Sequence, residues 1–282
     1  MRMEKNMSKP TILMVHGAFG GGWAFENFQN FFETRGYRCL APDLRHHSPA
    51  PSITHASKLA ATSLLDYLRD LEALVATLEG AFVLMGHSMG GLLCQMLAAR
   101  GHEAAALILL APSPPAGIIP ASSMEMLTAF GIFASGMGWG QSSLAPDRQT
   151  AAEHALSHVP APQKKAILDR LSPESGYALF EIMCWMMDMR QASRVDAARV
   201  TCPVLAIAGG HDSINTPDTV RQVARRYGDQ TEFHCVEKVS HWLLDGPQWP
   251  EIAEHCAAWL ERLAITGQAM AREQDKFSLT HS

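Results

Sequence analysis

Six short apolar runs are the feature of this sequence that most limits its fold, because most of their residues are apolar at consecutive positions. A strand with that pattern is covered on both faces, as the strands of a parallel sheet are. Longer segments with apolar residues at helical spacing lie between the runs, and this alternation favours a parallel α/β sheet. The predicted strands are Ile12–Val15, Arg38–Ala41, Phe82–Met85, Leu107–Leu110, Val204–Ala208 and Glu232–Val236.

The helices between these strands are predicted from their periodicity and their end signals. Thr216 is a plausible N-cap, Pro217 stands at a first helical position, and Gly228 follows the same helix. The predicted α/β core covers residues 8–111 and 201–266, and the polar residues 267–282 are expected to form a C-terminal tail. The helices predicted in the core are Ser57–Leu78, Met89–Ala99, Pro217–Tyr227 and Pro250–Leu263.

Residues 112–200 interrupt the alternation, because no convincing strand is found there. The segment begins with a stretch rich in Pro and Ser that is typical of a linker, and helical patterns follow. Ser172 before Pro173 is a good helix start. We therefore expect a helical cap inserted between two strands of the sheet. Its predicted helices are Met124–Ser135, Ala151–His158, Gln163–Leu171 and Pro173–Met189.

Composition restricts the class of partner. The 282 residues carry a net charge of −5 and show no basic stripe that would track phosphates, so we expect no nucleic-acid partner. No apolar run approaches the ~20 residues that span a bilayer, so we expect no membrane partner. The six cysteines are scattered without CxxC or zinc spacing and favour a reducing, cytoplasmic location. A small-molecule substrate is the expected partner, and a homodimer is left open.

The motif Gly86-His87-Ser88-Met89-Gly90 lies between a predicted buried strand and a predicted helix. Such a tight strand-to-helix turn requires strained dihedral angles and small neighbours, and it lifts the serine hydroxyl above the sheet edge. The pattern alone is weak, since a glycine-rich loop with a capping serine also fits it. Its position between strand and helix favours a nucleophile.

A serine nucleophile needs a base, and that base should be a histidine oriented by a carboxylate. Asp212 and His241 each follow a predicted strand, so both lie at the carboxyl edge of the sheet together with Ser88. Open α/β sheets build their sites at this edge. Asp245, close to His241, and Asp188, in the insertion, remain alternative acids.

The chain resembles the α/β-hydrolase fold family over nearly its whole length. The resemblance implies a serine esterase or hydrolase with a helical cap, and it implies the catalytic triad Ser88, His241 and Asp212. Four features carry it in the right order: His16-Gly17 after the first strand, GHSMGG at the elbow, Asp212 after a later strand, and Ser240-His241 before the last helix.

The same resemblance implies an oxyanion hole. One donor is the backbone N–H of Met89, and the other is that of Ala18, with Phe19 as the near alternative. The stretch HGAFGGGW looks like the corresponding loop of small-molecule esterases and hydroxynitrile lyases of this fold. A phosphate loop is disfavoured, because the GK[ST] ending and the GxGxxG spacing are absent. Many members begin with an extra hairpin, but only ten residues precede Thr11, so we expect six strands rather than eight.

Other polar residues have structural interpretations. Asp43 follows a strand and is expected to hold the next loop. His46 and His47 would point apart, and His154 and His158 share a helix face without a convincing third ligand, so no metal site is expected.

The insertion is rich in Met and aromatic residues, which predict an apolar, adaptable underside above Ser88. The expected substrate is an uncharged, fairly apolar acyl compound, cleaved as an ester through an acyl-enzyme without metal or organic cofactor. Lactone, amide or carbon–carbon bond hydrolysis, a lyase of the same fold and a non-catalytic receptor are the alternatives. The residues expected to line the pocket are Phe19, Phe130, Phe133, Trp139, Trp185 and Trp242.

Overall fold

The computed structural model describes residues 9–47, 53–119 and 142–279, and it describes their side chains except in 53–55 and 265–279. Its main sheet is parallel, which confirms the predicted α/β class and all six predicted strands. The strands are β1 (Thr11–Val15), β2 (Arg38–Leu40), β3 (Phe82–His87), β4 (Ala106–Leu110), β7 (Val204–Gly209) and β8 (Thr231–Val236). Their order across the sheet is β2-β1-β3-β4-β7-β8.

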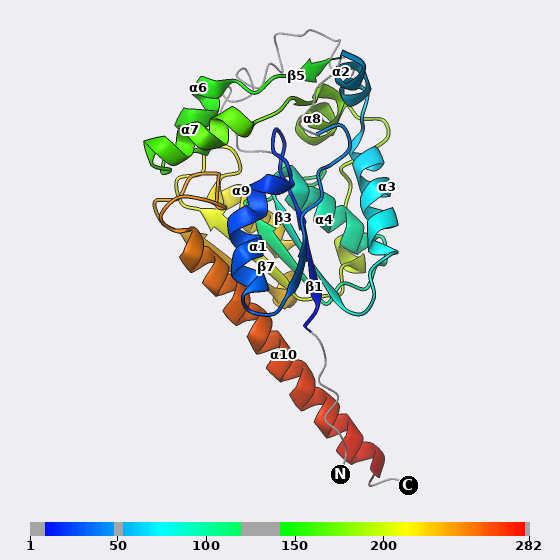
Figure 1. Cartoon of the computed structure of the whole chain (residues 1–282). Coiled ribbons are helices and arrows are strands. Elements are labelled where there is room, and N and C mark those ends of the chain that lie inside the picture. The colour runs from blue at the N-terminus through cyan, green and yellow to red at the C-terminus, as the bar shows by residue number, and fades with distance from the viewer. Residues whose placement is uncertain (1–8, 48–52, 120–141, 280–282) are drawn as a thin grey trace.

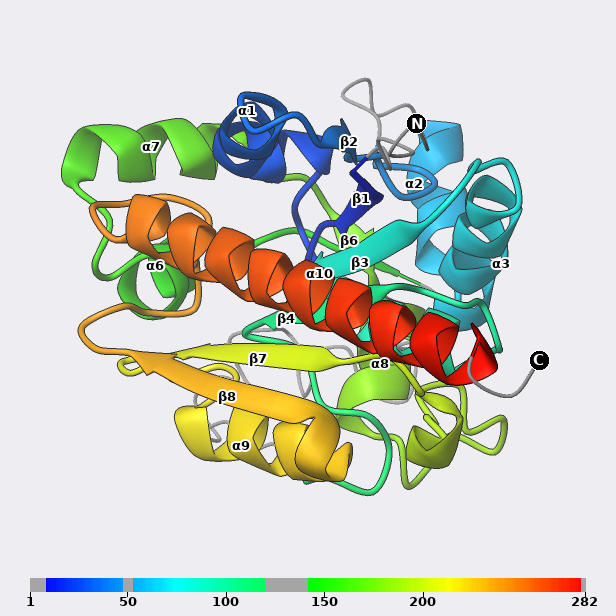
Figure 2. The ribbon, with the colours of Figure 1, turned by 90° about the horizontal axis from the view of Figure 1, so that it is seen from below.

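One face of the sheet is covered by α1 (Glu26–Glu33) and α10 (Trp249–Leu279). Ile12 and Met14 of β1 point to this face and belong to the same buried cluster as Phe28 of α1. Figure 2 shows α10 crossing the sheet, and Figure 1 shows it extending beyond the body of the protein. The expected helix end at Leu263 is wrong, because the chain from 264 to 279 is rich in helix-forming residues and Gly267 alone costs only about 1 kcal/mol.

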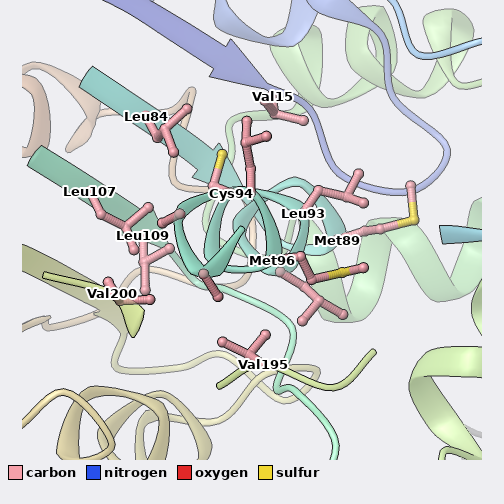
Figure 3. Close-up of a cluster of buried hydrophobic side chains, with 14 of the residues drawn as sticks. Val15, Leu84, Met89, Leu93, Cys94, Met96, Leu107, Leu109, Val195 and Val200 are labelled. Carbon is pink, nitrogen blue, oxygen red and sulfur yellow. The ribbon is translucent and has the colours of Figure 1, made fainter. Parts of the chain in front are cut away.

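The opposite face is covered by α3 (Leu64–Val75), α4 (Met89–Ala99) and α9 (Pro217–Arg225). Every residue of α4 is buried, and a helix that is apolar on all sides belongs in a core. Figure 3 shows why: α4 lies between Leu84 and Leu107 of the strands and Val195 of a later loop. This helix begins directly after Ser88, so the packing of α4 fixes the position of the serine.

The predicted helix Ser57–Leu78 is two helices, α2 (Ile53–Ala60) and α3. Ser63 separates them because its side chain accepts a hydrogen bond from the Leu65 N–H, and the Asp66 carboxylate accepts one from the Ser63 N–H. This reciprocal cap starts a new helix within a continuous apolar pattern.

The insertion between β4 and β7 contains α6 (Arg148–Thr150), α7 (Ala161–Arg170) and α8 (Gly176–Met183), gathered above the sheet in Figure 1. Residues Ala151–Ala155 form a π-helical turn after α6. The expectation of no strand is wrong in one place, since β5 (Ser143–Leu144) and β6 (Glu174–Ser175) pair antiparallel. The helix predicted from Pro173 starts at Gly176, because Ser175 rather than Ser172 caps it through the Ala178 N–H. The predicted helix Met124–Ser135 lies outside the described residues, and the limits 112–200 of the cap stay a prediction.

Candidate active site

Ser88 stands at the turn between β3 and α4 in a strained conformation, with φ of 51° and ψ of −121°. A positive φ is costly for a residue with a side chain and persists only where its surroundings impose it. The Ser88 N–H donates to the Leu110 carbonyl of β4 at 3.0 Å, and its own carbonyl accepts from the Ser113 N–H at 2.9 Å. The end of β4 and the loop after it therefore hold the serine in place.

The glycines of the elbow are required by close backbone contacts. A Cβ at Gly90 would lie 2.0 Å from the Val15 carbonyl oxygen, and one at Gly86 would lie 2.3 Å from the Gly90 oxygen. No side chain fits at either distance. The sequence prediction of small neighbours thus has a specific cause: α4 starts directly against β1.

His241 and Asp212 are in direct contact. The His241 Nδ1 lies 2.8 Å from Asp212 Oδ2, and since a carboxylate only accepts, the Nδ1–H is the donor. The other carboxylate oxygen accepts from the N–H groups of Ile214 at 2.8 Å and Asn215 at 3.0 Å. This arrangement leaves His241 Nε2 unprotonated in the neutral ring. His241 and Ser88 line the same cavity.

The alternative acids have other partners. Asp245 accepts from Asn27 Nδ2 at 2.6 Å and from the Trp242 indole N–H at 2.9 Å. Asp188 accepts from the N–H groups of Arg190 and Ala192, at 2.9 and 2.6 Å, and so closes a local turn. Neither carboxylate contacts His241.

Asp43 has a structural partner in a different loop from the one expected: its carboxylate accepts from the Gly22 N–H at 2.7 Å.

The predicted oxyanion donors also meet at this cavity. Ala18 and Met89 both line it, and neither N–H donates to a backbone carbonyl within the described part of the chain. His16 shapes the first loop: its Nδ1 donates to the Gly17 carbonyl at 2.8 Å, and its Nε2 accepts from the Leu44 N–H at 3.0 Å. Burial lowers the pKa of His16 to about 4, so the ring stays neutral and the loop keeps this geometry.

His87 is a residue of the site that the sequence reasoning missed. Its Nε2 donates to the His241 carbonyl at 2.9 Å, and its ring lies 4.9 Å from the His241 ring. Burial, followed by the proximity of His241, lowers the pKa of His87 to about 3. A neutral imidazole thus supports the loop of His241. The position of His87 beside Ser88 in the motif is the sequence signal that could have identified it.

The cavity is mainly apolar, and its described lining contains no Lys or Arg. Phe19 and Trp242 line it as expected. Trp185 is not among the described residues that line it, and α8 ends two residues before it, at Met183. Phe130, Phe133 and Trp139 lie outside the described residues. The cap contributes Ala145, Pro146, Asp147, Thr150, Ala151, Ala155, Leu156, Leu171, Leu179, Ile182 and Met183.

Two buried glutamates of the cap bind the core helix α3. Glu174 accepts from the Tyr67 hydroxyl at 2.7 Å and pairs with His47 Nε2 at 3.0 Å. Burial acts to lower the pKa of His47, but the Glu174 carboxylate outweighs it, and the pKa of His47 is raised. Glu181 accepts from the Ser63 hydroxyl and the Leu64 N–H, both at 2.7 Å. The cap is therefore joined to the core by polar bonds as well as apolar packing.

Among the described residues, no group of three or more His, Cys, Asp or Glu is arranged to hold a metal ion. Within the same ranges, no helix has the length and hydropathy needed to cross a bilayer.

A model of the Alpha/beta hydrolase family matches residues 12–254. A pyrethroid hydrolase of Sphingobium wenxiniae is 32% identical over 116 residues, which are 40% of this chain and 40% of that protein. An sn-1-specific diacylglycerol lipase of Mus musculus is 25% identical over 270 residues, or 87% of this chain and 80% of the lipase. The match to the pyrethroid hydrolase thus spans less than half of its length.

The fold has solved relatives as well. The crystal structure of a monoacylglycerol lipase from Paleococcus ferrophilus superposes with a TM-score of 0.68 at 19% identity and covers 91% of this chain and 96% of the lipase. At this identity the likeness shows the fold alone.

Proposed function

Because this chain belongs to the alpha/beta hydrolase family, we propose that it is a serine hydrolase that cleaves a carboxylic ester or a related acyl bond. The observation that carries the proposal is the 2.8 Å bond between His241 and Asp212 at a cavity that the strained Ser88 also lines. Relatives named a hydrolase and a lipase support the same reaction class.

In the proposed reaction, the Ser88 hydroxyl attacks the acyl carbon while His241 Nε2 takes its proton. Asp212 keeps the Nδ1 proton in place and stabilises the imidazolium. The N–H groups of Ala18 and Met89 stabilise the oxyanion, and each such donor is typically worth about 2.7–4 kcal/mol in the transition state. His241 then gives its proton to the leaving alcohol, and a water activated by His241 releases the acid.

The cavity lining supports an uncharged, apolar acyl group. The described lining offers one carboxylate, Asp147, and no cation, so it would disfavour an anionic substrate. Leu156, Leu179 and Ile182 of the cap provide apolar surface for the acyl chain.

The test is the reaction of the intact protein with a fluorophosphonate, read by intact mass beside Ser88→Ala. One adduct on the wild type and none on the variant is the expected result, because only an activated serine displaces fluoride. No adduct on a folded wild type would contradict the proposal and favour the alternative of a lyase that uses the same residues as an acid and base.

A further inference from the structure

The cap touches the loops of both His241 and Asp212 through one short stretch. We call residues 151–158 the bridge segment; it comprises the π-helical turn Ala151–Ala155 and the three residues after it. Its two histidines, His154 and His158, were expected to lie on an ordinary helix face. Each of them instead meets a serine that directly adjoins a proposed catalytic residue. π-Helical turns are rare and occur frequently at functional sites.

The loop of His241 is bound on both sides of the catalytic ring. Ser240, which precedes it, is fully buried; its N–H donates to His158 Nδ1 at 3.2 Å, and its hydroxyl donates to the Ala155 carbonyl at 2.7 Å. Trp242, which follows it, donates its N–H to the same Ala155 carbonyl at 3.0 Å. The backbone around His241 therefore takes its position from the bridge segment.

The ring of His158 is held by polar contacts on both of its nitrogens. Its Nδ1 lies 2.7 Å from the Ser240 hydroxyl and 3.2 Å from the Ser240 nitrogen, and its Nε2 lies 3.4 Å from the Asp245 carbonyl. Burial lowers the pKa of His158, which favours the neutral ring. The neighbouring Leu156 and Val159 are buried in the core cluster that contains Trp242.

The loop that carries Asp212 and the loop that carries Ala18 are also hydrogen-bonded to the cap. His154 Nδ1 lies 3.0 Å from the hydroxyl of Ser213, the residue after Asp212. Ser172, which follows the next cap helix, donates its N–H to the Phe19 carbonyl at 2.9 Å. All three of these loops, which carry proposed catalytic groups, are thus bonded to the insertion.

We propose that His158, assisted by His154, is a positioning residue that holds the catalytic loops in their reactive geometry. The inference rests on the proposed function. The cap is then part of the catalytic scaffold rather than only a cover, since displacing the bridge segment releases both His241 and Asp212. A misplacement of about 1 Å in a reacting group can cost ~10²-fold in rate, so the loss falls on kcat.

The experiment compares His158→Leu with His158→Asn. The Asn Oδ1 and the His Nδ1 are both attached to Cγ, so Asn keeps the acceptor for the Ser240 N–H and Leu removes it. We expect His158→Leu to reduce both the rate of fluorophosphonate reaction and kcat for p-nitrophenyl butanoate by roughly 10–100-fold, with KM changed less than about threefold. His158→Asn should restore most of the rate. His102→Leu, at a half-buried histidine after α4, is the matched control and should react as wild type.

The possible results distinguish a failure of the proposed function from a failure of the positioning role. A wild type that does not react contradicts the proposed function. A reactive wild type with an equally fast His158→Leu, or an Asn variant as slow as the Leu variant, overturns the positioning role and leaves the proposed function intact. Should His158→Leu fail to fold by circular dichroism, His154→Ala decides: a loss of kcat of about threefold to tenfold supports the inference, and an unchanged kcat overturns it.

Discussion

Replacing Asp212 with Asn should abolish most activity by reversing the tautomer of His241. Asp212 Oδ1 faces the N–H groups of Ile214 and Asn215, at 2.8 and 3.0 Å, so in the Asp212→Asn variant the carbonyl oxygen of the new amide must stay on that side. The new NH₂ group then faces His241 Nδ1, which becomes an acceptor. The proton moves to Nε2, where the base is needed to take the proton of Ser88.

The size of the effect follows from the loss of the base. The equivalent change in a serine protease lowers kcat by about 10⁴, which corresponds to about 5.4 kcal/mol at 1.36 kcal/mol for each factor of ten. We expect a similar reduction here, because the same two hydrogen bonds fix the amide orientation. Folding should be preserved, since the amide replaces the carboxylate without a change of size.

The assay is kcat on p-nitrophenyl butanoate with the melting temperature measured in parallel. Asp245→Asn is the matched control, because its carboxylate binds Asn27 and Trp242 instead of His241. A folded Asp212→Asn variant that keeps more than about a tenth of the wild-type kcat would contradict the role of Asp212 and assign the acid to another carboxylate.

Two further predictions concern stability. Gly90→Ala places a methyl group 2.0 Å from the Val15 carbonyl oxygen and should lower the free energy of unfolding, measured by denaturant titration, by about 3 kcal/mol or more. The control Gly36→Ala has no atom within 4 Å of the new methyl group and should cost only the ~1–2 kcal/mol of a positive φ. Equal losses in the two variants would show that the close contact at the elbow is not the cause. Burial raises the pKa of Glu181 from 4.5 to about 7, so the contribution of this group to stability is present below pH 4.5 and is lost as the pH rises through 7. Glu181→Gln should therefore flatten the decline of the melting temperature between pH 4.5 and 7. Parallel curves of melting temperature against pH for wild type and variant would contradict the raised pKa of Glu181.

Much of the fold was predictable because its strands carry their own signal. The four central strands, β1, β3, β4 and β7, are buried and mostly apolar on consecutive positions, as expected where helices cover both faces of a sheet. This pattern predicted a parallel sheet and the carboxyl edge at which Ser88, Asp212 and His241 were expected. Helix ends were less predictable. The apolar repeat from 57 to 78 continues across the break at Ser63, and the cap that makes the break needs only local polar contacts.

The residues that follow each strand can be identified from the amino-acid sequence, because the order of strands and loops along the chain is a local property. Which of these residues touch one another depends on the tertiary structure. Glu174 and Glu181 meet α3, and His154 and His158 meet the loops of Asp212 and His241, across separations of 59 to 118 residues. The local sequence around a polar residue of the cap is the same whether its side chain faces water or a buried serine. Its partner is set by how the insertion packs on the sheet, and that packing is a property of the whole chain.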